Sequence, residues 1–249
     1  MYYFVHIEKC AGTTLHEILA LTFLRYVHIT KNHFGGNEKK NDLSLSEYQK
    51  IKKMLPSIIG GHNIRPYLNF IEPSNCFTFF RNPIDRYISQ YNHDHERGFS
   101  PSFDHFLNRS YSRNFMVQKI AGEENFEKAK LLLAQFMFVG DVDNFTQSIE
   151  RLSKILKVRF YGRTQNHNVR NNHPNYLTFE QLSLEQRELA RSQNELDIKL
   201  YNYFIEKNSF ANNDSNQYSF REPSEYRVKL INKLNKIKKN KVNQIRKIN

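Results

Sequence analysis

A short loop between a strand and a helix constrains this chain more than any other feature. The segment YYFVHI (2–7) is short, aromatic and β-branched, which predicts a strand. In TTLHEILALTFLRY (13–26) apolar residues recur at the spacing of a helix. Between them lie small residues and one lysine, Lys9. The sequence therefore opens with a strand, a tight loop and a helix.

The same order recurs along the chain. SIIGGH (57–62) and NCFTFFR (75–81) are predicted as buried strands, and a helix is expected to start at Pro83, since proline suits a first helical turn. FMFVGD (136–141) is another short strand before an amphipathic helix. This alternation indicates an α/β fold with a P-loop-like central parallel sheet flanked by helices. In such sheets the ligand site lies beyond the carboxyl ends of the strands.

Length and charge define the expected domains. A chain of 249 residues can bury one core, so a single domain is expected over residues 1–207, followed by a polar linker at 208–220. Residues 221–249 hold ten Lys or Arg and two Glu, a net +8 of the total +12. This basic tail is a candidate amphipathic helix, either solvated without a dedicated partner or in contact with a membrane surface, nucleic acid or an acidic glycan. For the protein we expect a possible contact with an anionic surface and no nucleic-acid partner. Its predicted apolar face consists of Leu230, Leu234, Ile237, Ile245 and Ile248.

Cysteine content and hydropathy bear on the compartment. Cys10 and Cys76 form no disulfide framework and have no metal-ligand spacing, which favours a reducing environment. No signal peptide and no membrane span can be read from the sequence. We therefore expect a cytoplasmic protein.

Two strand ends have the composition of anion-binding sites. After the first strand, Lys9 precedes a predicted helix N-terminus, and Thr13 and Thr14 add hydroxyl donors. The order of residues differs from the P-loop pattern, because the lysine comes before the single glycine. In NCFTFFR (75–81), Arg81 is the last residue of an apolar strand, and Ser89 follows in the next helix. Arginine and serine are both suitable donors to phosphate oxygens.

Four motifs resemble those of the sulfotransferases that act on carbohydrates, among them the heparan and uronyl 2-O-sulfotransferases and the chondroitin sulfotransferases. HIEKCAGTTLHEIL (6–19) resembles the family form H-I-P-K-[TC]-[GA]-G-T-[ST]-L, and FTFFRNPIDRYISQY (77–91) resembles R-[DN]-P-x-x-R-x-x-S-x-Y. FVGDVDNFTQSIERL (138–152) and NELDIKLYNYF (194–204) are similar to two further family segments, in the same order.

The resemblance implies the donor 3′-phosphoadenosine 5′-phosphosulfate (PAPS) and no metal. In the family, the lysine contacts the oxygen that bridges sulfur and phosphorus, the residues after it hold the 5′-phosphate, and the arginine and serine hold the 3′-phosphate. Lys9 would thus be catalytic, and the segment YGRTQNHNVRNN (161–172) lies where adenine contacts are expected. The implied donor-binding residues are Lys9, Cys10, Ala11, Gly12, Thr13, Thr14, Arg81 and Ser89.

The acceptor hydroxyl needs a proton acceptor, and His62 is the candidate. It ends a predicted strand, and GGHNIRPY resembles the family's G-H-x-x-[FY] segment, with a different spacing to the aromatic residue. A structural role for His62 stays open. Glu8 stands where the family usually has proline and is a second base or an ion-pair partner; Arg65 and Glu8 are the candidate acceptor contacts.

Other functions remain as alternatives. A P-loop nucleotide kinase shares the expected sheet but would need a Walker lysine in register, and a non-enzymatic polyanion binder would explain only the basic tail. HDHE (93–96) is not favoured as a metal site, because histidines two apart on a helix point to different faces. The expected function is transfer of a sulfuryl group to a carbohydrate hydroxyl, while the acceptor and the oligomeric state cannot be read from the sequence.

Overall fold

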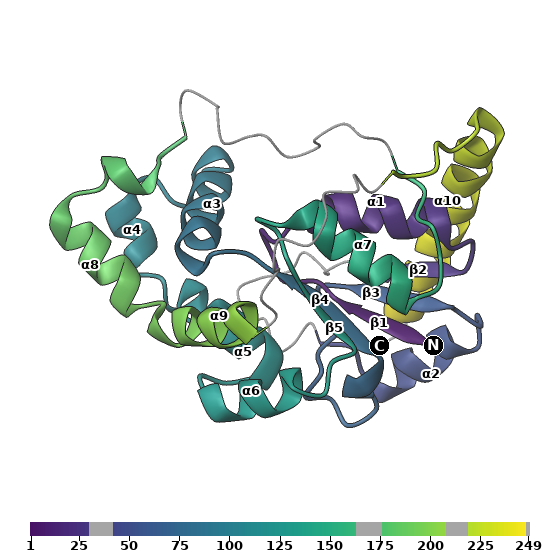
Figure 1. Cartoon of the computed structure of the whole chain (residues 1–249), viewed down its shortest axis with the longest axis horizontal. Helices are drawn as coiled ribbons and strands as arrows, with labels where there is room; N and C mark the ends of the chain where they lie inside the picture. Colours follow the sequence, from purple (N-terminus) through teal and green to yellow (C-terminus); the bar gives the residue numbers. More distant parts are fainter. Residues whose placement is uncertain (30–41, 163–175, 208–218, 248–249) are drawn as a thin grey trace.

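The computed structural model describes residues 1–29, 42–162, 176–207 and 219–247, and Figure 1 shows its arrangement. Five parallel strands form one central sheet in the order β2-β3-β1-β4-β5. Helices flank the sheet, so the chain is a single-domain α/β protein as the sequence predicts. The strands are β1 (Tyr2–Val5), β2 (Tyr26–Ile29), β3 (Ile58–Gly61), β4 (Cys76–Phe80) and β5 (Phe138–Asp141).

Successive strand residues point to opposite faces of the sheet, and helices cover both faces, so side chains on both are buried. Phe4 and Phe77 pack on one face against α1 (Gly12–Thr22) and α7 (Phe145–Ile155). Tyr3 and Val5 face the other core, which the remaining flanking helices supply. These are α2 (Leu45–Lys52), α5 (Phe115–Ala121), α6 (Phe126–Leu133) and α9 (Glu195–Lys207).

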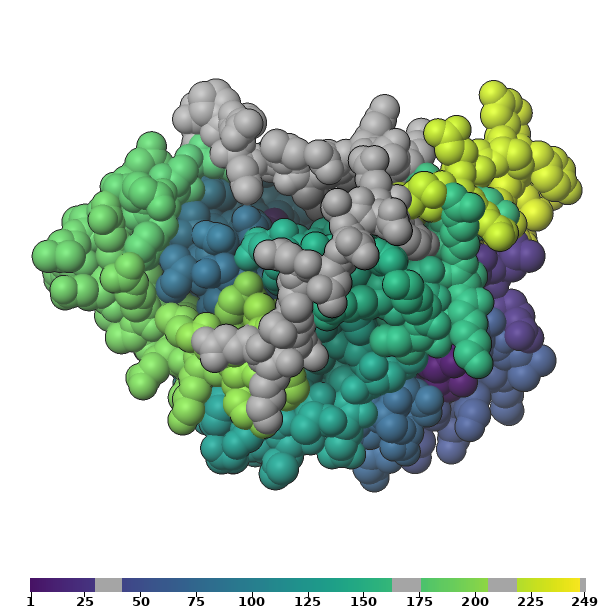
Figure 2. All heavy atoms as spheres, in the orientation of Figure 1, coloured from purple at the N-terminus to yellow at the C-terminus, as the bar shows by residue number. Residues whose placement is uncertain are grey.

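A second group of helices forms a separate small core at one end of the molecule (Figures 1 and 2). It comprises α3 (Pro83–Glu96), α4 (Phe103–Leu107) and α8 (Leu184–Ser192). Tyr87 and Tyr91 of α3 pack there against aromatic residues of α4. In the described part of the chain, short 3₁₀ turns occur at Pro73–Asn75, Ser110–Ser112 and Phe179–Gln181.

The basic C-terminal segment forms α10 (Glu225–Lys247), which covers the β2 edge of the sheet at the other end of the molecule (Figures 1 and 2). Lys238 donates to the backbone oxygens of Leu24 and Tyr26, and Arg246 forms a buried ion pair with Glu47 of α2 (Nε to Oε1, 3.3 Å). An edge strand that is covered in this way cannot pair with another chain.

The predicted apolar face of α10 is wrong at Ile237, which is 55% exposed. Ile231 and Val242 are buried instead, together with Ile245, which was predicted. Polar contacts such as those of Lys238 and Arg246 set the rotation of the helix, and apolar spacing alone does not contain them. Ile248 and most of the predicted linker lie outside the described residues.

One strand was not predicted. The expected helix over 13–26 ends as α1 at Thr22, and Tyr26 begins β2. Arg227 of α10 donates to the carbonyl oxygens of Leu21 (2.8 Å) and Thr22 (3.0 Å), and so binds the last turn of α1. A partner some 200 residues away in the sequence stabilises this helix end, which local periodicity could not reveal.

The strand order determines where the loops meet. β1 lies between β3 and β4, so the segments that follow these three strands share one edge of the sheet. All strands are parallel, so this edge holds their carboxyl ends. The predicted candidate segments around Lys9, His62 and Arg81 begin there.

We predict that Val242→Asp destabilises the protein by about 3 kcal/mol or more, because it buries an unpaired carboxylate under α10. The matched change Ile237→Asp, on the exposed side of the same helix, should shift the free energy of unfolding by about 0.5 kcal/mol or less. Urea denaturation measures both. Equal effects of the two changes would contradict the packing of α10 on the body.

Candidate active site

The loop after β1 leaves the N-terminus of α1 without a side-chain cap. Lys9 (φ 69°) and Ala11 (φ 55°) adopt left-handed conformations, which cost non-glycine residues about 1 kcal/mol each and turn the chain sharply into the helix. Ala11 is the N-cap of α1, and its methyl side chain cannot accept a hydrogen bond from the first amides of the helix. In α3, by contrast, Asn82 accepts hydrogen bonds from the amides of Ile84 and Asp85. The uncapped end of α1 therefore has the properties of an anion site.

Gly12 is required by the packing of His6. A Cβ atom on Gly12 would lie 1.7 Å from Nε2 of His6, a distance that no side chain tolerates. The His6 ring is held from three sides: it stacks on Phe4 and on His62, and Nδ1 lies 2.9 Å from Nε2 of His16. The glycine thus brings the start of α1 against a fixed imidazole ring.

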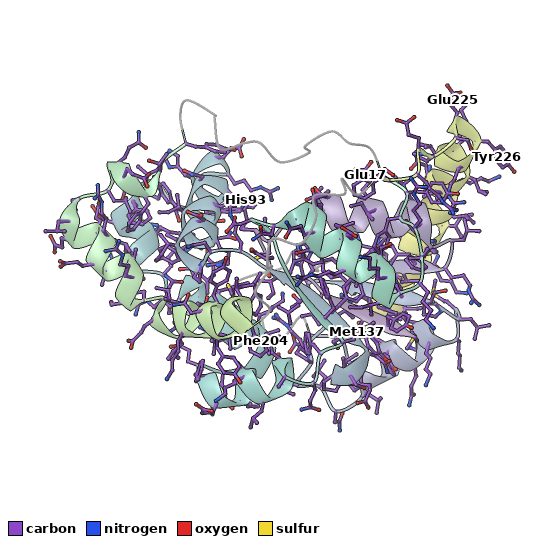
Figure 3. The ribbon with its side chains drawn as sticks, in the orientation of Figure 1. Glu17, His93, Met137, Phe204, Glu225 and Tyr226 are labelled. Carbon is purple, nitrogen blue, oxygen red and sulfur yellow. The ribbon has the colours of Figure 1, made fainter. Side chains whose placement is uncertain are left out.

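Lys9, Arg81 and Ser89 line one cavity of about 210 Å³. The three side chains come from the loop after β1, the end of β4 and the second turn of α3, and all are half-buried. The other described walls come from α3 and from residues 176–180. His93 is one of the wall residues, and Figure 3 shows it on α3, the helix that bounds the cavity. Three polar groups predicted from two separate motifs are therefore brought to a single pocket.

Cys10 is a buried residue of this loop. The residue is buried, and burial raises the pKa of its thiol to about 12 despite the nearby positive charges of Arg86 and Arg81. At neutral pH the group is a thiol and not a thiolate, so it is a poor nucleophile. Cys10 contributes to this part of the protein by packing.

Arg86 also belongs to the interior. Its side chain is fully buried, Nη2 donates to the carbonyl oxygen of Ser112 (3.3 Å), and the guanidinium lies over the Phe115 ring. Burial raises the pKa of Asp197 to about 6, while the charge of Arg86 and the amides of Met116 and Val117 oppose that shift. The charge of Arg86 therefore acts on a buried carboxylate, and Arg86 is not among the described residues that line the cavity.

His62 lies on the other side of β1. Nδ1 of His62 is 3.0 Å from Oε1 of Glu8, and the His62 ring stacks on His6 at a centroid distance of 4.0 Å. Glu8 is bound in turn by Lys119 of α5, whose Nζ lies 2.9 Å from Oε2. At this distance the carboxylate stabilises positive charge on the imidazole of His62.

Arg65 is placed differently from the other candidates. Its residue exposure is 5%, and Nε donates to Oδ1 of Asp42 at 2.9 Å. Tyr67 donates to the other oxygen of the same carboxylate. Arg65 is not among the described residues that line the cavity of Lys9 and Arg81, so its role as an acceptor contact stays a prediction.

Sequence reasoning missed Lys119, His16 and His28. Lys119 is the one charged residue in the apolar segment FMVQKIA (115–121), a signal that does not say whether the side chain points inward. His16 and His28 stack at a centroid distance of 3.7 Å, and His16 also contacts the hydroxyl of Tyr26. Four histidines, His6, His16, His28 and His62, thus form a continuous group at the carboxyl edge of β1, β2 and β3.

Burial holds three of these histidines neutral. It is the largest cause that lowers the pKa of His6 and His16 well below the usual value, and it lowers that of His28 to about 4. The proximity of the other histidines lowers each value further. The surroundings of the candidate base are therefore uncharged near pH 7, apart from Glu8 and Lys119 among the described neighbours.

A comparison with protein families agrees with this geometry. The sulfotransferase family model matches residues 2–204, which include β1 through most of α9. The chain belongs to the sulfotransferase family. No curated protein matches the sequence at the threshold applied.

Membership gives the general reaction class, transfer of a sulfuryl group to an acceptor. Among the described residues no group of three or more His, Cys, Asp or Glu is placed to hold a metal ion. In the same ranges, no helix is both long and apolar enough to cross a membrane. Within the adenine-contact segment predicted at 161–172, residues 163–172 fall outside the described part.

The histidine group predicts a loss of stability in acid. The unfolded chain takes up protons near pH 6.5, whereas folded His28 resists protonation down to about pH 4, so stability should fall as the pH drops through this range. Each unit by which the pKa of His28 differs between the folded and the unfolded protein corresponds to about 1.4 kcal/mol in the free energy of unfolding. Urea denaturation at pH 7 and pH 5 should show a smaller pH effect in His28→Gln than in the wild type. His95→Gln, on an exposed residue of α3, is the control, and an unchanged pH effect in His28→Gln would contradict the prediction.

Proposed function

We propose that this sulfotransferase transfers the sulfuryl group of PAPS to a hydroxyl of a carbohydrate acceptor. The observation that carries the proposal is the convergence of Lys9, Arg81 and Ser89 on one cavity, with Lys9 in the loop that enters α1 at Gly12. Two cations, a hydroxyl and a helix N-terminus together suit a ligand with two separate anionic groups.

The residues fit the donor in two parts. The amides and hydroxyls of Gly12, Thr13 and Thr14 would hold the 5′-phosphosulfate, with Lys9 at the bridging oxygen. Arg81 and Ser89 would hold the 3′-phosphate, because a guanidinium fork and a short hydroxyl match phosphate oxygens. Cys10 and Ala11 contribute backbone to the same loop and shape its turn.

The donor supplies an activated sulfuryl group, and the protein supplies position and charge. The acceptor oxygen forms a bond to sulfur while the bond from sulfur to the bridging oxygen breaks. The acceptor proton passes to the base, and 3′-phosphoadenosine 5′-phosphate leaves. The ammonium of Lys9 stabilises the negative charge that develops on the leaving phosphate.

His62 is the proposed base. It follows β3, next to β1, and Oε1 of Glu8 lies 3.0 Å from Nδ1, so the carboxylate would stabilise the imidazolium that forms when the ring accepts the proton. Glu8 is bound to Lys119, and Arg65 is bound to Asp42. We retain Glu8 and Arg65 as candidate acceptor contacts. The fold leaves the acceptor open among glycans, lipid-linked sugars and small metabolites.

Three further parts of the proposal do not concern the cavity: the basic surface of α10, the compartment and the absence of a metal. The exposed lysines of α10, such as Lys229, Lys233 and Lys236, form a basic surface suited to an anionic partner. A cytoplasmic location and a reaction without metal also remain predictions.

Isothermal titration with 3′-phosphoadenosine 5′-phosphate tests the donor site. We expect binding that requires the 3′-phosphate, with AMP at least 100-fold weaker, and a loss of about 2–3 kcal/mol in Arg81→Ala because a charge-assisted phosphate contact is removed. Arg97→Ala, at the exposed end of the same helix, should bind as the wild type does. Equal binding of ATP, or no loss in Arg81→Ala, would refute the donor assignment.

Replacement of the base separates chemistry from binding. His62→Asn should lower kcat by roughly 10²–10⁴-fold, the range for loss of a general base, while the affinity for 3′-phosphoadenosine 5′-phosphate stays within about twofold. His95→Asn is the matched control on an exposed histidine. A His62→Asn enzyme with normal kcat would exclude the histidine as base.

A further inference from the structure

Lys119 has an unusual environment for a lysine. Its side chain is 0% exposed, and α5 carries it into the core beside Phe115. Burying an ammonium ion is costly unless oxygen atoms satisfy it. Nζ lies 3.1 Å from Oε1 and 2.9 Å from Oε2 of Glu8, and 2.8 Å from the carbonyl oxygen of His62. These three contacts equal the number of N–H donors that an ammonium has.

Both partners of Lys119 belong to the candidate active site. Glu8 lies in the loop after β1, and His62 directly follows β3, so Lys119 links the ends of two neighbouring strands. Oε1 of Glu8 lies within 3.1 Å of Nζ and 3.0 Å from Nδ1 of His62. A single carboxylate oxygen therefore contacts both the lysine and the imidazole.

We propose that Lys119 is a positioning residue, whose buried ammonium fixes the Glu8 carboxylate 3.0 Å from Nδ1 of His62 and so sets the position and the charge of the imidazole that accepts the proton. This inference rests on the proposed role of His62. Lys119 also holds the backbone of His62 through the carbonyl oxygen, which limits the movement of the ring. Lys119 needs no contact with either substrate for this role.

Lys119 has a second, electrostatic effect with a definite sign. The Glu8 carboxylate favours a protonated His62, and the Lys119 ammonium opposes it. The other titratable groups around His62 in the described part of the chain are His6, which stacks on its ring, and His16 and His28, which interact with it more weakly. These three are neutral near pH 7, so Glu8 and Lys119 act as a balanced pair.

The two members of this pair should therefore have opposite effects on His62. Lys119→Met leaves the carboxylate alone and should raise the pKa of His62 by about one unit, whereas Glu8→Gln leaves the ammonium alone and should lower it by a similar amount. The double variant Glu8→Gln/Lys119→Met should return close to the wild-type value. Lys128→Met, which removes an exposed ion pair with Glu123, is the control and should change nothing.

The experiment is an NMR titration of the His62 imidazole in these variants, with the resonance assigned from His62→Gln. The acid limb of the profile of kcat against pH should move in the same direction as the NMR value, and kcat at pH 7 should fall about tenfold in Lys119→Met. Shifts of opposite sign in the single variants support the proposal. An unchanged pKa of His62 in folded Glu8→Gln overturns the proposal. If Lys119→Met does not fold, the titration of Glu8→Gln serves as the test by itself.

Failure of the inference can be told apart from failure of the proposed function. The NMR titration reports on His62 whether or not sulfuryl transfer occurs. Binding of 3′-phosphoadenosine 5′-phosphate reports on the donor site, and we expect it to stay within twofold in each folded variant. Normal titration shifts without such binding would refute the donor and leave the role of Lys119 at His62 in place.

Discussion

The packing of His6 against Gly12 is the contact on which the candidate site depends. The chain must leave β1 at Val5 and enter α1 at Gly12, and it does so with two residues in left-handed conformations. Because the imidazole ring fills the space where a side chain on residue 12 would lie, the helix begins close to the sheet. The turn is made by backbone conformation, and Ala11 at the N-cap has no side chain that could accept from the first amides of α1, an arrangement that suits the proposed phosphate contact.

The neighbours of β1 divide the chemistry between two sides. β4 delivers Arg81, and α3 adds Ser89, on the side where anion-binding groups gather. β3 delivers His62 on the other side, where Glu8 and Lys119 meet it. A parallel sheet in the order β3-β1-β4 thus places the proposed donor pocket and the proposed proton acceptor on either side of one loop. Burial keeps His6 and His16 uncharged there, so Glu8 and Lys119 are the charged neighbours of His62 in the described part of the chain.

Much of this could be predicted from the sequence because it is local. The strand-loop-helix at the N-terminus and the strand that ends at Arg81 are set by short-range apolar patterns, and the parallel sheet follows from their alternation. Contacts between distant segments were not accessible. The end of α1 depends on Arg227, the rotation of α10 depends on Lys238 and Arg246, and the surroundings of His62 depend on Lys119. In each case a long polar side chain from one element contacts a distant element, and the spacing of apolar residues does not predict such a contact.

A crystal structure of the protein with 3′-phosphoadenosine 5′-phosphate would test the central claim most directly. We expect the 5′-phosphate at the N-terminus of α1, within hydrogen-bond distance of the amides of Gly12 and Thr13, and the 3′-phosphate on Arg81 and Ser89. His62 and Lys9 should then face the space beyond the 5′-phosphate. A nucleotide bound elsewhere, or with its 3′-phosphate away from Arg81, would contradict the assignment of this loop as the donor site.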